Sequence, residues 1–232
     1  MEIQKKNNID LSIVIPTFNG SRYMQALYAR LNTELHRLGR NYECIFVIDG
    51  SRDDTVHILE SIGKQDNRIV IAKFDRNYGQ HSAIHAGIRI SQGEIVVVLN
   101  DDMVGCIGEL ERFINEIDKG KEVIFGWRLS RTNISCVRKM ISFFINFFIS
   151  LLIGIRIHDA GCGFKCFKKK VICEGRSHLE LISRLKKYKF RELKIRCSES
   201  SESRYNFVKC IKLFFAIITS MFRKDTLKYH LE

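Results

Sequence analysis

The chain has 232 residues, which is enough for one sizeable domain or two small ones. Its apolar fraction of 45% and charged fraction of 28% exclude an intrinsically disordered chain and a fibrous protein. The net charge of +12 is unevenly spread, because residues 1–129 carry 16 Lys and Arg against 18 Asp and Glu, whereas residues 130–232 carry 22 against 8. We therefore expect the second part to bind anions, such as a phosphorylated substrate, a nucleic acid or an anionic membrane surface.

The amino-terminal residues predict a protein that stays in the cytoplasm. Residues 1–10 lead into an apolar run of only six residues, which is too short for the hydrophobic region of a secretory signal. Without export, we expect the eight cysteines to be reduced and buried. Cys162, Cys166 and Cys173 lie close together in the sequence, but no CxxC pair or neighbouring pair of histidines completes a zinc site.

Short apolar runs alternate with longer amphipathic segments through the first half of the chain. Nearly continuous apolar character, typical of strands buried on both faces, predicts strands at 11–16, 43–48, 68–74, 93–100 and 122–127. Helical spacing after polar starts predicts helices at 21–38, 53–63, 80–91 and 107–119. The alternation predicts an α/β fold with a mostly parallel central sheet and helices on both faces. Ligands of such sheets bind beyond the carboxyl ends of the strands.

The second part contains two amphipathic segments without a strand pattern. Residues 140–155 carry no charge, and as a helix they would span only about 24 Å, short of a hydrocarbon core of about 30 Å. Small or polar residues recur at intervals of four in this segment, at Ser142, Asn146, Ser150 and Gly154. Residues 207–222 combine lysines with aromatic and aliphatic side chains. We predict helices that lie in a membrane interface or dock by the polar stripe, with two core helices as the alternative.

Polar clusters follow four of the predicted strands. A turn alone explains any one of them, but four clusters in phase with four strands indicate a shared site at one sheet edge. The clusters are Thr17-Phe18-Asn19, Asp49-Gly50-Ser51, Arg76-Asn77-Tyr78-Gly79 and Asn100-Asp101-Asp102.

The last cluster points to a cation. Neighbouring carboxylates at a strand end repel each other, so Asp101 and Asp102 suggest Mg²⁺ or Mn²⁺ held together with substrate phosphates. The alternative is a pair of acidic residues that begins the next helix.

These motifs together resemble the nucleotide-sugar domain of family 2 inverting glycosyltransferases of the GT-A fold. The resemblance is carried by IPTFNG, VIDGSRDDT, RNYGQHSAIHAG and GEIVVVLNDD, in that order within residues 11–127. It continues more loosely in GWRLSR, HDAGCGFKCF and Ser203-Arg204-Tyr205, which are similar to the pattern of polyprenyl-phosphate glycosyltransferases, the dolichyl-phosphate mannose synthase group.

The resemblance implies a nucleotide-sugar site in residues 1–129. Pro16, Thr17 and Asp49 would border the nucleobase, with Asp49 accepting its ring N–H. Asn100 and Asp102 stand at the outer places of the D-x-D motif, which bridges the ribose and a metal-bound diphosphate. Asn100 replaces the usual Asp and supplies no charge to the metal. The wider set of expected nucleotide-sugar ligands adds Asn19, Ser51, Arg76, Asn77, Gly79 and Asp101.

The resemblance also implies an acceptor-binding part of the same domain in residues 130–232. Asp159 matches an acidic residue near the acceptor phosphate and, with Asp102, is expected to be catalytic. The expected ligands of the acceptor phosphate are Arg128, Arg131, Lys165 and Arg204. Lys165 stands where the family often has Arg, so a bidentate contact with phosphate is lost.

We therefore expect a metal-dependent, inverting glycosyltransferase that moves a sugar from a nucleotide-sugar donor to a polyprenyl phosphate. It would be peripheral at the inner face of the cell membrane. A phosphate acceptor already carries a nucleophilic oxygen, so it needs orientation more than a base. One alternative is a family 2 enzyme that glycosylates a saccharide hydroxyl in surface polysaccharide synthesis. Another is a non-catalytic protein that binds membrane surfaces. Nucleic acid is not expected, because the aromatic residues of the basic part are not interleaved with its charges.

Overall fold

The computed structural model describes residues 9–129, 136–173, 181–182 and 184–196. Its contacts divide the chain after Asp101 into two compact units, which we call unit 1 (to Asp101) and unit 2 (from Asp102). The charge pattern placed the division after residue 129 instead. The division after residue 129 separates a predicted nucleotide-sugar-binding part from a predicted acceptor-binding part, and it stays a prediction.

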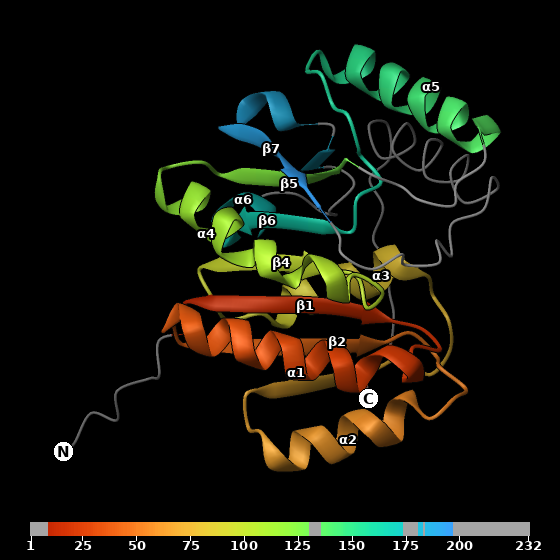
Figure 1. Ribbon diagram of the computed structural model, residues 1–232, viewed down its shortest axis with the longest axis vertical. Coiled ribbons are helices and arrows are strands. Elements are labelled where there is room, and N and C mark those ends of the chain that lie inside the picture. The colour runs from red at the N-terminus through yellow and green to blue at the C-terminus, as the bar shows by residue number, and fades with distance from the viewer. Residues whose placement is uncertain (1–8, 130–135, 174–180, 183, 197–232) are drawn as a thin grey trace. The chain divides into compact units, whose positions relative to one another are not determined.

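Unit 1 alternates strands and helices as the sequence predicts (Figure 1). Its elements are β1 (Leu11–Thr17), α1 (Ser21–Leu38), β2 (Tyr42–Ile48), α2 (Thr55–Gln65), β3 (Ile69–Lys73), α3 (Gln80–Ile90) and β4 (Ile95–Leu99). The strands are parallel in the order β3-β2-β1-β4, and Leu11 pairs with both Tyr42 and Ile95. Every residue of β1, β2 and β4 is buried, which explains their continuous apolar sequences.

The strand order of unit 1 determines which face of the sheet each helix covers. From β1 to β3 the chain moves one way along the sheet, and from β3 to β4 it moves back past β1. Because crossovers between parallel strands are right-handed, α1 and α2 lie on one face and α3 on the other. Consistent with this order, α1 contacts α2, and α3 contacts β1 and β2. The predicted arrangement of helices on both faces is therefore confirmed for unit 1.

Unit 2 contains η1 (Val104–Glu109), α4 (Leu110–Asp118), β5 (Val123–Arg128), α5 (Cys136–Ile153), β6 (Phe164–Lys168), α6 (Lys169–Cys173), η2 (Leu185–Lys187) and β7 (Phe190–Ile195). Strand β5 pairs with β6 antiparallel and with β7 parallel. Aromatic side chains fill the core: Phe113 stacks on Phe164 with ring centroids 4.1 Å apart, and Phe125 meets the edge of Phe190. Over both units the strand pairs are mostly parallel, as expected, and the pairing of β6 with β5 is the antiparallel exception.

The cysteines follow the expectation only in part. Cys44, Cys162 and Cys166 are free and buried. Burial raises the pKa of the Cys162 thiol to about 11, so this group stays protonated at neutral pH. Cys106, in contrast, is disulfide-bonded, which corrects the expectation of a fully reduced chain.

Candidate functional site

The ends of β1 and β4 are joined by a buried hydrogen bond. The hydroxyl of Thr17 donates to Oδ2 of Asp101 at 2.7 Å, and both residues are at most 5% exposed. A Cβ at Gly20 would lie 2.4 Å from the Thr17 hydroxyl and 2.6 Å from the Asp101 carboxylate, so only glycine fits beside this bond. Asp101 therefore ties two strand ends together. Its neighbour Asp102 is partly exposed.

Side-chain hydrogen bonds connect the loop that follows β1 with the loop that follows β2. The Asn19 N–H donates to Oγ of Ser51 at 3.0 Å, and Asn19 Oδ1 accepts the Arg52 N–H at 2.9 Å. Asn19 has a φ of 49°, a left-handed conformation that asparagine tolerates better than most residues. The Asp53 carboxylate accepts the Ser21 N–H, at the start of α1. Partial burial acts to raise the pKa of Asp53, but hydrogen bonds from Thr55 and Ser21 outweigh it and lower this pKa to about 2.

Asp49, at the end of β2, orders the loop that precedes α3. Its two carboxylate oxygens accept the N–H groups of Tyr78 at 2.7 Å and Gly79 at 2.9 Å, and its carbonyl accepts Asn77 Nδ2 at 3.1 Å. Burial is the largest influence on the pKa of Asp49 and raises it above the ordinary value, although the two N–H groups act in the opposite direction. Gly50 has a φ of +66°, and a Cβ there would meet the Arg76 carbonyl carbon at 2.5 Å. The second and third loops therefore approach each other closely.

The fourth cluster joins the same edge of unit 1. Asn100 Oδ1 accepts Gln80 Nε2, at the start of α3, at 2.6 Å. Arg76 lies over the Tyr78 ring, 5.1 Å from its centroid, and Pro16 is buried within β1. The four predicted clusters do meet at the carboxyl ends of the strands, as the sequence indicates. The roles of their residues in binding stay predictions.

A second group of predicted residues meets in unit 2. Arg128, the last residue of β5, forms a bidentate pair with Asp159: Nε donates to Oδ2 at 2.8 Å and Nη2 to Oδ1 at 3.0 Å. The Asp159 side chain is only 2% exposed and that of Arg128 is 24% exposed. Burial acts to lower the pKa of Arg128, but the attraction of Asp159 and other anionic groups, including Asp102, raises it above the ordinary value. Asp159 therefore has its counter-ion built in.

Lys165 of β6 is buried in the same region. Its Nζ lies 4.7 Å from the centroid of the Phe125 ring. Burial is the main cause that lowers the pKa of Lys165 to about 8, while Arg128 lowers it further and Asp159 opposes the shift. Arg131 and Arg204, the other predicted phosphate ligands, lie outside the described residues.

The sequence did not reveal the residue that holds the loop carrying Asp159. Glu192 of β7, 8% exposed, accepts the His158 N–H at 2.9 Å and lies 2.6 Å from His158 Nδ1. The His158 ring stacks on Trp127, with centroids 3.9 Å apart. Glu192 belongs to no motif, and 34 residues separate it from His158. His158 stacks on Trp127 of β5, and β5 pairs with β7, which carries Glu192, so the packing of these elements brings the two residues together.

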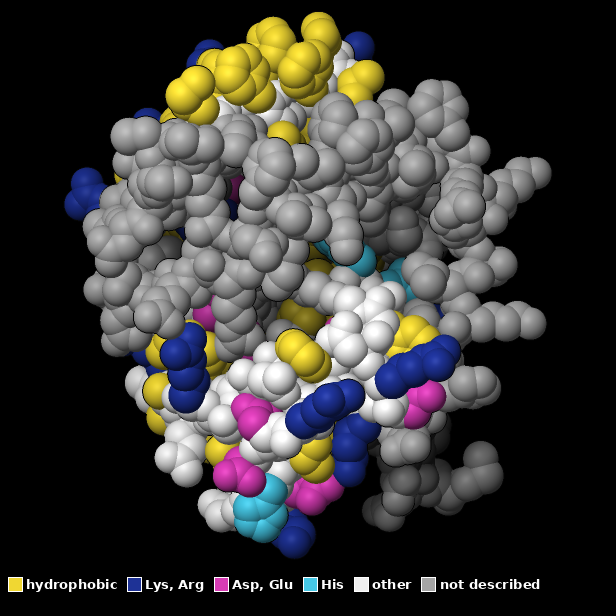
Figure 2. Space-filling view, turned by 90° about the vertical axis from the view of Figure 1, so that its right-hand side faces the viewer, with side chains coloured by type: hydrophobic (Ala, Val, Ile, Leu, Met, Phe, Trp, Pro, Cys, Tyr) yellow, Lys and Arg dark blue, Asp and Glu magenta, His cyan; other side chains and the backbone are white. Residues whose placement is uncertain are grey.

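Helix α5 exposes most of its large apolar side chains to solvent, while Ile149 and Ile153 are buried and Asn146 and Ser150 of its polar stripe contact the protein. Asn146 Nδ2 donates to the His158 carbonyl at 2.6 Å, and Ser150 Oγ accepts the Ile157 N–H at 2.9 Å. The stripe therefore docks on the chain segment that follows α5. The exposed apolar residues, which gather over α5 in Figure 2, are Met140, Phe143, Phe144, Phe147, Phe148, Leu151 and Leu152. Among the helices that the structure describes, none is both long and apolar enough to cross a bilayer.

Two residues of the sequence are predicted to hold a divalent cation. Asp102 supplies a carboxylate, and Asn100, two residues earlier, supplies an amide oxygen. Within the described ranges, no group of three or more His, Cys, Asp and Glu is placed to hold a metal ion. Mg²⁺ often binds one or two carboxylates and takes its other ligands from waters and substrate phosphates. One carboxylate and one amide oxygen are too few to hold a cation alone, and they suit a cation that arrives with a diphosphate.

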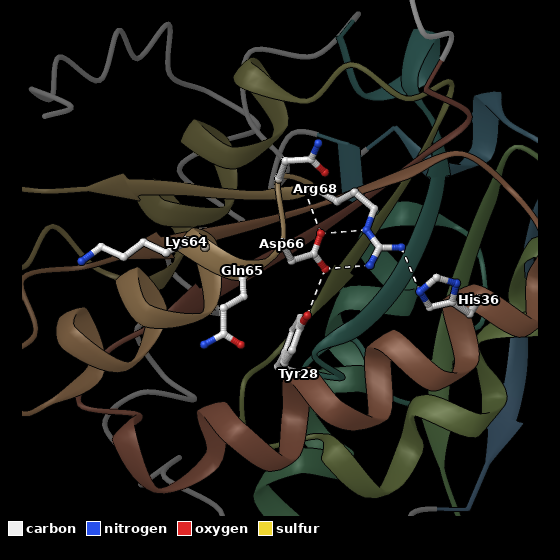
Figure 3. Close-up of a pocket in the computed structure, with 8 residues that line it drawn as sticks. Tyr28, His36, Lys64, Gln65, Asp66 and Arg68 are labelled. Atoms are coloured by element: carbon white, nitrogen blue, oxygen red, sulfur yellow. Dashed lines mark hydrogen bonds and ion pairs between the residues drawn. The ribbon is translucent and has the colours of Figure 1, made fainter.

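A polar pocket of about 620 Å³ lies elsewhere in unit 1 (Figure 3). The Asp66 carboxylate pairs there with Arg68 in a bidentate manner and accepts the Tyr28 hydroxyl at 3.0 Å. Chiefly the hydrogen bond from Arg68 lowers the pKa of Asp66. Both partners immediately precede β3, so the pocket lies at the amino end of that strand. We interpret the Asp66–Arg68 ion pair in this pocket as structural, because ligands of parallel sheets bind at the opposite ends of the strands.

Comparison with known proteins identifies relatives of this fold. Residues 12–175 match the family model described as glycosyl transferase family 2. The structure is similar to glucosyl-3-phosphoglycerate synthase from Mycobacterium tuberculosis in complex with Mn²⁺, uridine diphosphate and glucosyl-3-phosphoglycerate. That match has a TM-score of 0.72 and 11% identity, and it covers 98% of this chain and 88% of the other. Mannosyl-3-phosphoglycerate synthase from Rubrobacter xylanophilus matches with a TM-score of 0.68 and 12% identity, over 93% of this chain and 74% of the other. These likenesses confirm the expected GT-A fold.

Proposed function

The chain belongs to glycosyl transferase family 2, and we propose that it moves a sugar, with inversion, from a nucleotide-sugar donor to a polyprenyl phosphate at a membrane surface. The observation that carries this proposal is the contrast between two sets of carboxylates. Those of unit 1 accept hydrogen bonds from hydroxyl and N–H groups around four strand ends, whereas Asp159 of unit 2 is paired with a guanidinium. The first set suits the N–H groups of a nucleotide donor, and the second suits an anionic acceptor.

The strand ends of unit 1 support the donor half of the proposal. Asp49 would accept a ring N–H of the nucleobase, since a carboxylate that already accepts two N–H groups has further lone pairs. Thr17 and Pro16 would border the base, and the loops ordered by Asn19 and Ser51 would line the ribose. Arg76, Asn77 and Gly79 would contribute from the loop that Asp49 holds in place.

Asp102 and Asn100 would hold Mg²⁺ or Mn²⁺ against the diphosphate. When bound, such a cation neutralises the charge that grows on the departing diphosphate. The structural relatives include one crystallised with Mn²⁺ and uridine-diphosphate-glucose, which agrees with the chemistry proposed here.

The Arg128–Asp159 pair supports a phosphate acceptor over an alcohol. An alcohol needs a base to take its proton, and a carboxylate bound by two guanidinium N–H groups is a weak base. A guanidinium has five N–H groups, and the pair with Asp159 uses two of them. We propose that Asp159 orients Arg128 toward the acceptor phosphate. Lys165, Arg131 and Arg204 would add positive charge.

Helix α5 supports attachment at the membrane surface. Seven large apolar side chains of α5 are 46–68% exposed, and such a helix face binds the boundary between lipid headgroups and acyl chains. The basic second part would add electrostatic attraction of roughly 1 kcal/mol for each Lys or Arg near an anionic surface. We therefore propose a peripheral location at the cytoplasmic face. Sedimentation with anionic vesicles should weaken in high salt, and binding that salt leaves unchanged would contradict the electrostatic part.

Radiolabelled sugar transfer tests the proposed reaction. The full chain would be incubated with a panel of labelled nucleotide sugars, Mn²⁺ and a polyprenyl phosphate, and the label would then be partitioned between organic solvent and water. We expect label in the organic phase. If the label appeared only in soluble saccharide or in free sugar, the lipid acceptor would be contradicted. Label in soluble saccharide would also support the alternative acceptor, a sugar hydroxyl.

A further inference from the structure

A pocket of about 510 Å³ lies between α5 and the segment that follows it in unit 2. Its apolar walls come from Phe143, Phe147, Leu151 and Ile155. Arg156 and His158 lie at its lining and supply the charged and titratable groups. Ligand pockets usually measure about 300–1,000 Å³, so this one is large enough for part of a small amphiphile.

The pocket is built before any ligand arrives. Asn146 and Ser150, inside α5, bind the backbone at His158 and Ile157, so the helix and the following segment cannot separate without breaking these hydrogen bonds. Asn146 also accepts the Ala160 N–H at 3.2 Å through its Oδ1. Both walls are therefore fixed relative to each other, which lowers the entropic cost of binding.

The His158 ring is held in one orientation at the pocket. Its Nδ1 lies 2.6 Å from the Glu192 carboxylate, and its plane stacks on Trp127. A phosphate oxygen would bind the imidazolium form, in which Nδ1 donates to Glu192 and Nε2 donates to the ligand. His158 also precedes Asp159, whose partner is Arg128. The pocket and the Arg128–Asp159 pair are therefore held by the same loop, which Glu192 orders.

We infer that this pocket binds the first isoprenoid units of a polyprenyl phosphate, with the phosphate toward His158 and Arg156 and the hydrocarbon against α5. The inference rests on the proposed function and adds to it a specific lipid-binding site. The charge of the lining argues for this occupant. A neutral lipid leaves Arg156 and His158 unused, and free phosphate leaves the apolar walls unused.

Tryptophan fluorescence provides a test that does not need the reaction. Trp127 is the single tryptophan of the chain and stacks on His158, so its emission reports on ligands at this ring. Farnesyl phosphate, kept below its micelle concentration, would be titrated into the full-length protein. Farnesol and inorganic phosphate would be titrated separately. We expect a saturable change with farnesyl phosphate at concentrations at least tenfold below those that either half-molecule requires.

Two adjacent phenylalanines give a matched pair of variants. Phe147 lines the pocket and Phe148 does not, yet both are on α5 and they are 54% and 46% exposed. Phe147→Ala should weaken farnesyl phosphate binding about tenfold, and Phe148→Ala should leave it unchanged. Equal weakening by both substitutions, or an equal response to inorganic phosphate alone, would overturn the inference.

The same variants separate this inference from the proposed function. If the wild type transfers sugar to polyprenyl phosphate while Trp127 does not respond and Phe147→Ala transfers normally, the pocket assignment is wrong and the proposed function stands. If farnesyl phosphate binds as expected while the label never enters the organic phase, the pocket assignment stands and the proposed acceptor is wrong.

Discussion

The carboxylates at the strand ends of unit 1 are held differently from Asp159 of unit 2. In unit 1, Asp49 accepts two backbone N–H groups and Asp101 accepts the hydroxyl of Thr17. In unit 2, Asp159 is bound by both arms of the Arg128 guanidinium. Neutral donors orient a carboxylate while leaving its charge in place, whereas a guanidinium compensates the charge. The difference agrees with the proposed roles, in which the strand ends of unit 1 meet N–H donors of a ligand and Arg128 of unit 2 meets an anion.

The largest effect is expected when the carboxylate assigned to the cation is removed, that of Asp102, the first residue of unit 2. Asp102→Asn should lower sugar transfer by about a thousandfold, equivalent to about 4 kcal/mol, because charge on the leaving diphosphate is no longer neutralised. The free energy of unfolding should fall by no more than about 1 kcal/mol, because Asp102 is partly exposed and is the smallest of the influences that raise the pKa of Arg128. Transfer assays and urea denaturation measure the two quantities. Activity above a tenth of the wild-type value would contradict the proposed role.

The built-in ion pair of unit 2 can be broken from its cationic side. Arg128→Met leaves the Asp159 carboxylate, 2% exposed, without its guanidinium, so the free energy of unfolding should fall by about 3–4 kcal/mol. The double variant Arg128→Met/Asp159→Leu should recover most of this loss, because two apolar side chains need no counter-ion. Urea denaturation compares the three proteins. A loss below about 1 kcal/mol in the single variant would show that water compensates Asp159.

Lys165 sharpens the comparison, because it is a second cation beside the same pair. Its pKa of about 8 in the folded chain lies below the ordinary value of 10.5, so its burial destabilises the protein fully below pH 8. The penalty shrinks as pH rises through 8 and is gone above about 10.5. Lys165→Met should therefore raise the free energy of unfolding by about 3 kcal/mol at pH 6–7 and by little near pH 10.5. A gain that does not change with pH would contradict this account.

The smallest effect is expected for a neutral donor in unit 1. Thr17→Val keeps the shape of the side chain but removes the hydroxyl that donates to Asp101, which should cost about 1–2 kcal/mol. Thr33→Val on α1 is the control, because the Thr33 hydroxyl donates to the Ala29 carbonyl at an exposed position. If Thr17→Val destabilised the protein as much as Arg128→Met, the distinction between neutral and charged partners would be lost.

The elements of unit 1 could be predicted from the sequence to within two residues at each end. Strands buried on both faces need continuous apolar runs, and helices beside them need a period near 3.6, so both signals are local. The same reasoning predicted that Thr17, Asp49, Asn77 and Asn100 would meet, because parallel strands present their carboxyl ends at one edge. The elements of unit 2 were harder to predict from the sequence, and β6 and β7 were not predicted. The partner of β7, strand β5, lies more than sixty residues earlier.

By itself the sequence determined the order of strands and helices, the edge at which the polar clusters gather, and the family to which the chain belongs. These depend on residue types at short spacing. Only the tertiary structure decided that Asp101 ties β1 to β4, that Glu192 holds the loop of His158, and that α5 turns its polar stripe inward and its phenylalanines outward. Each of these depends on a contact between side chains and partners that the folded chain brings together, such as Thr17 and Asp101, 84 residues apart. The spacing of residues along the chain does not predict such partners, because the packing of the helices and strands determines which side chains meet.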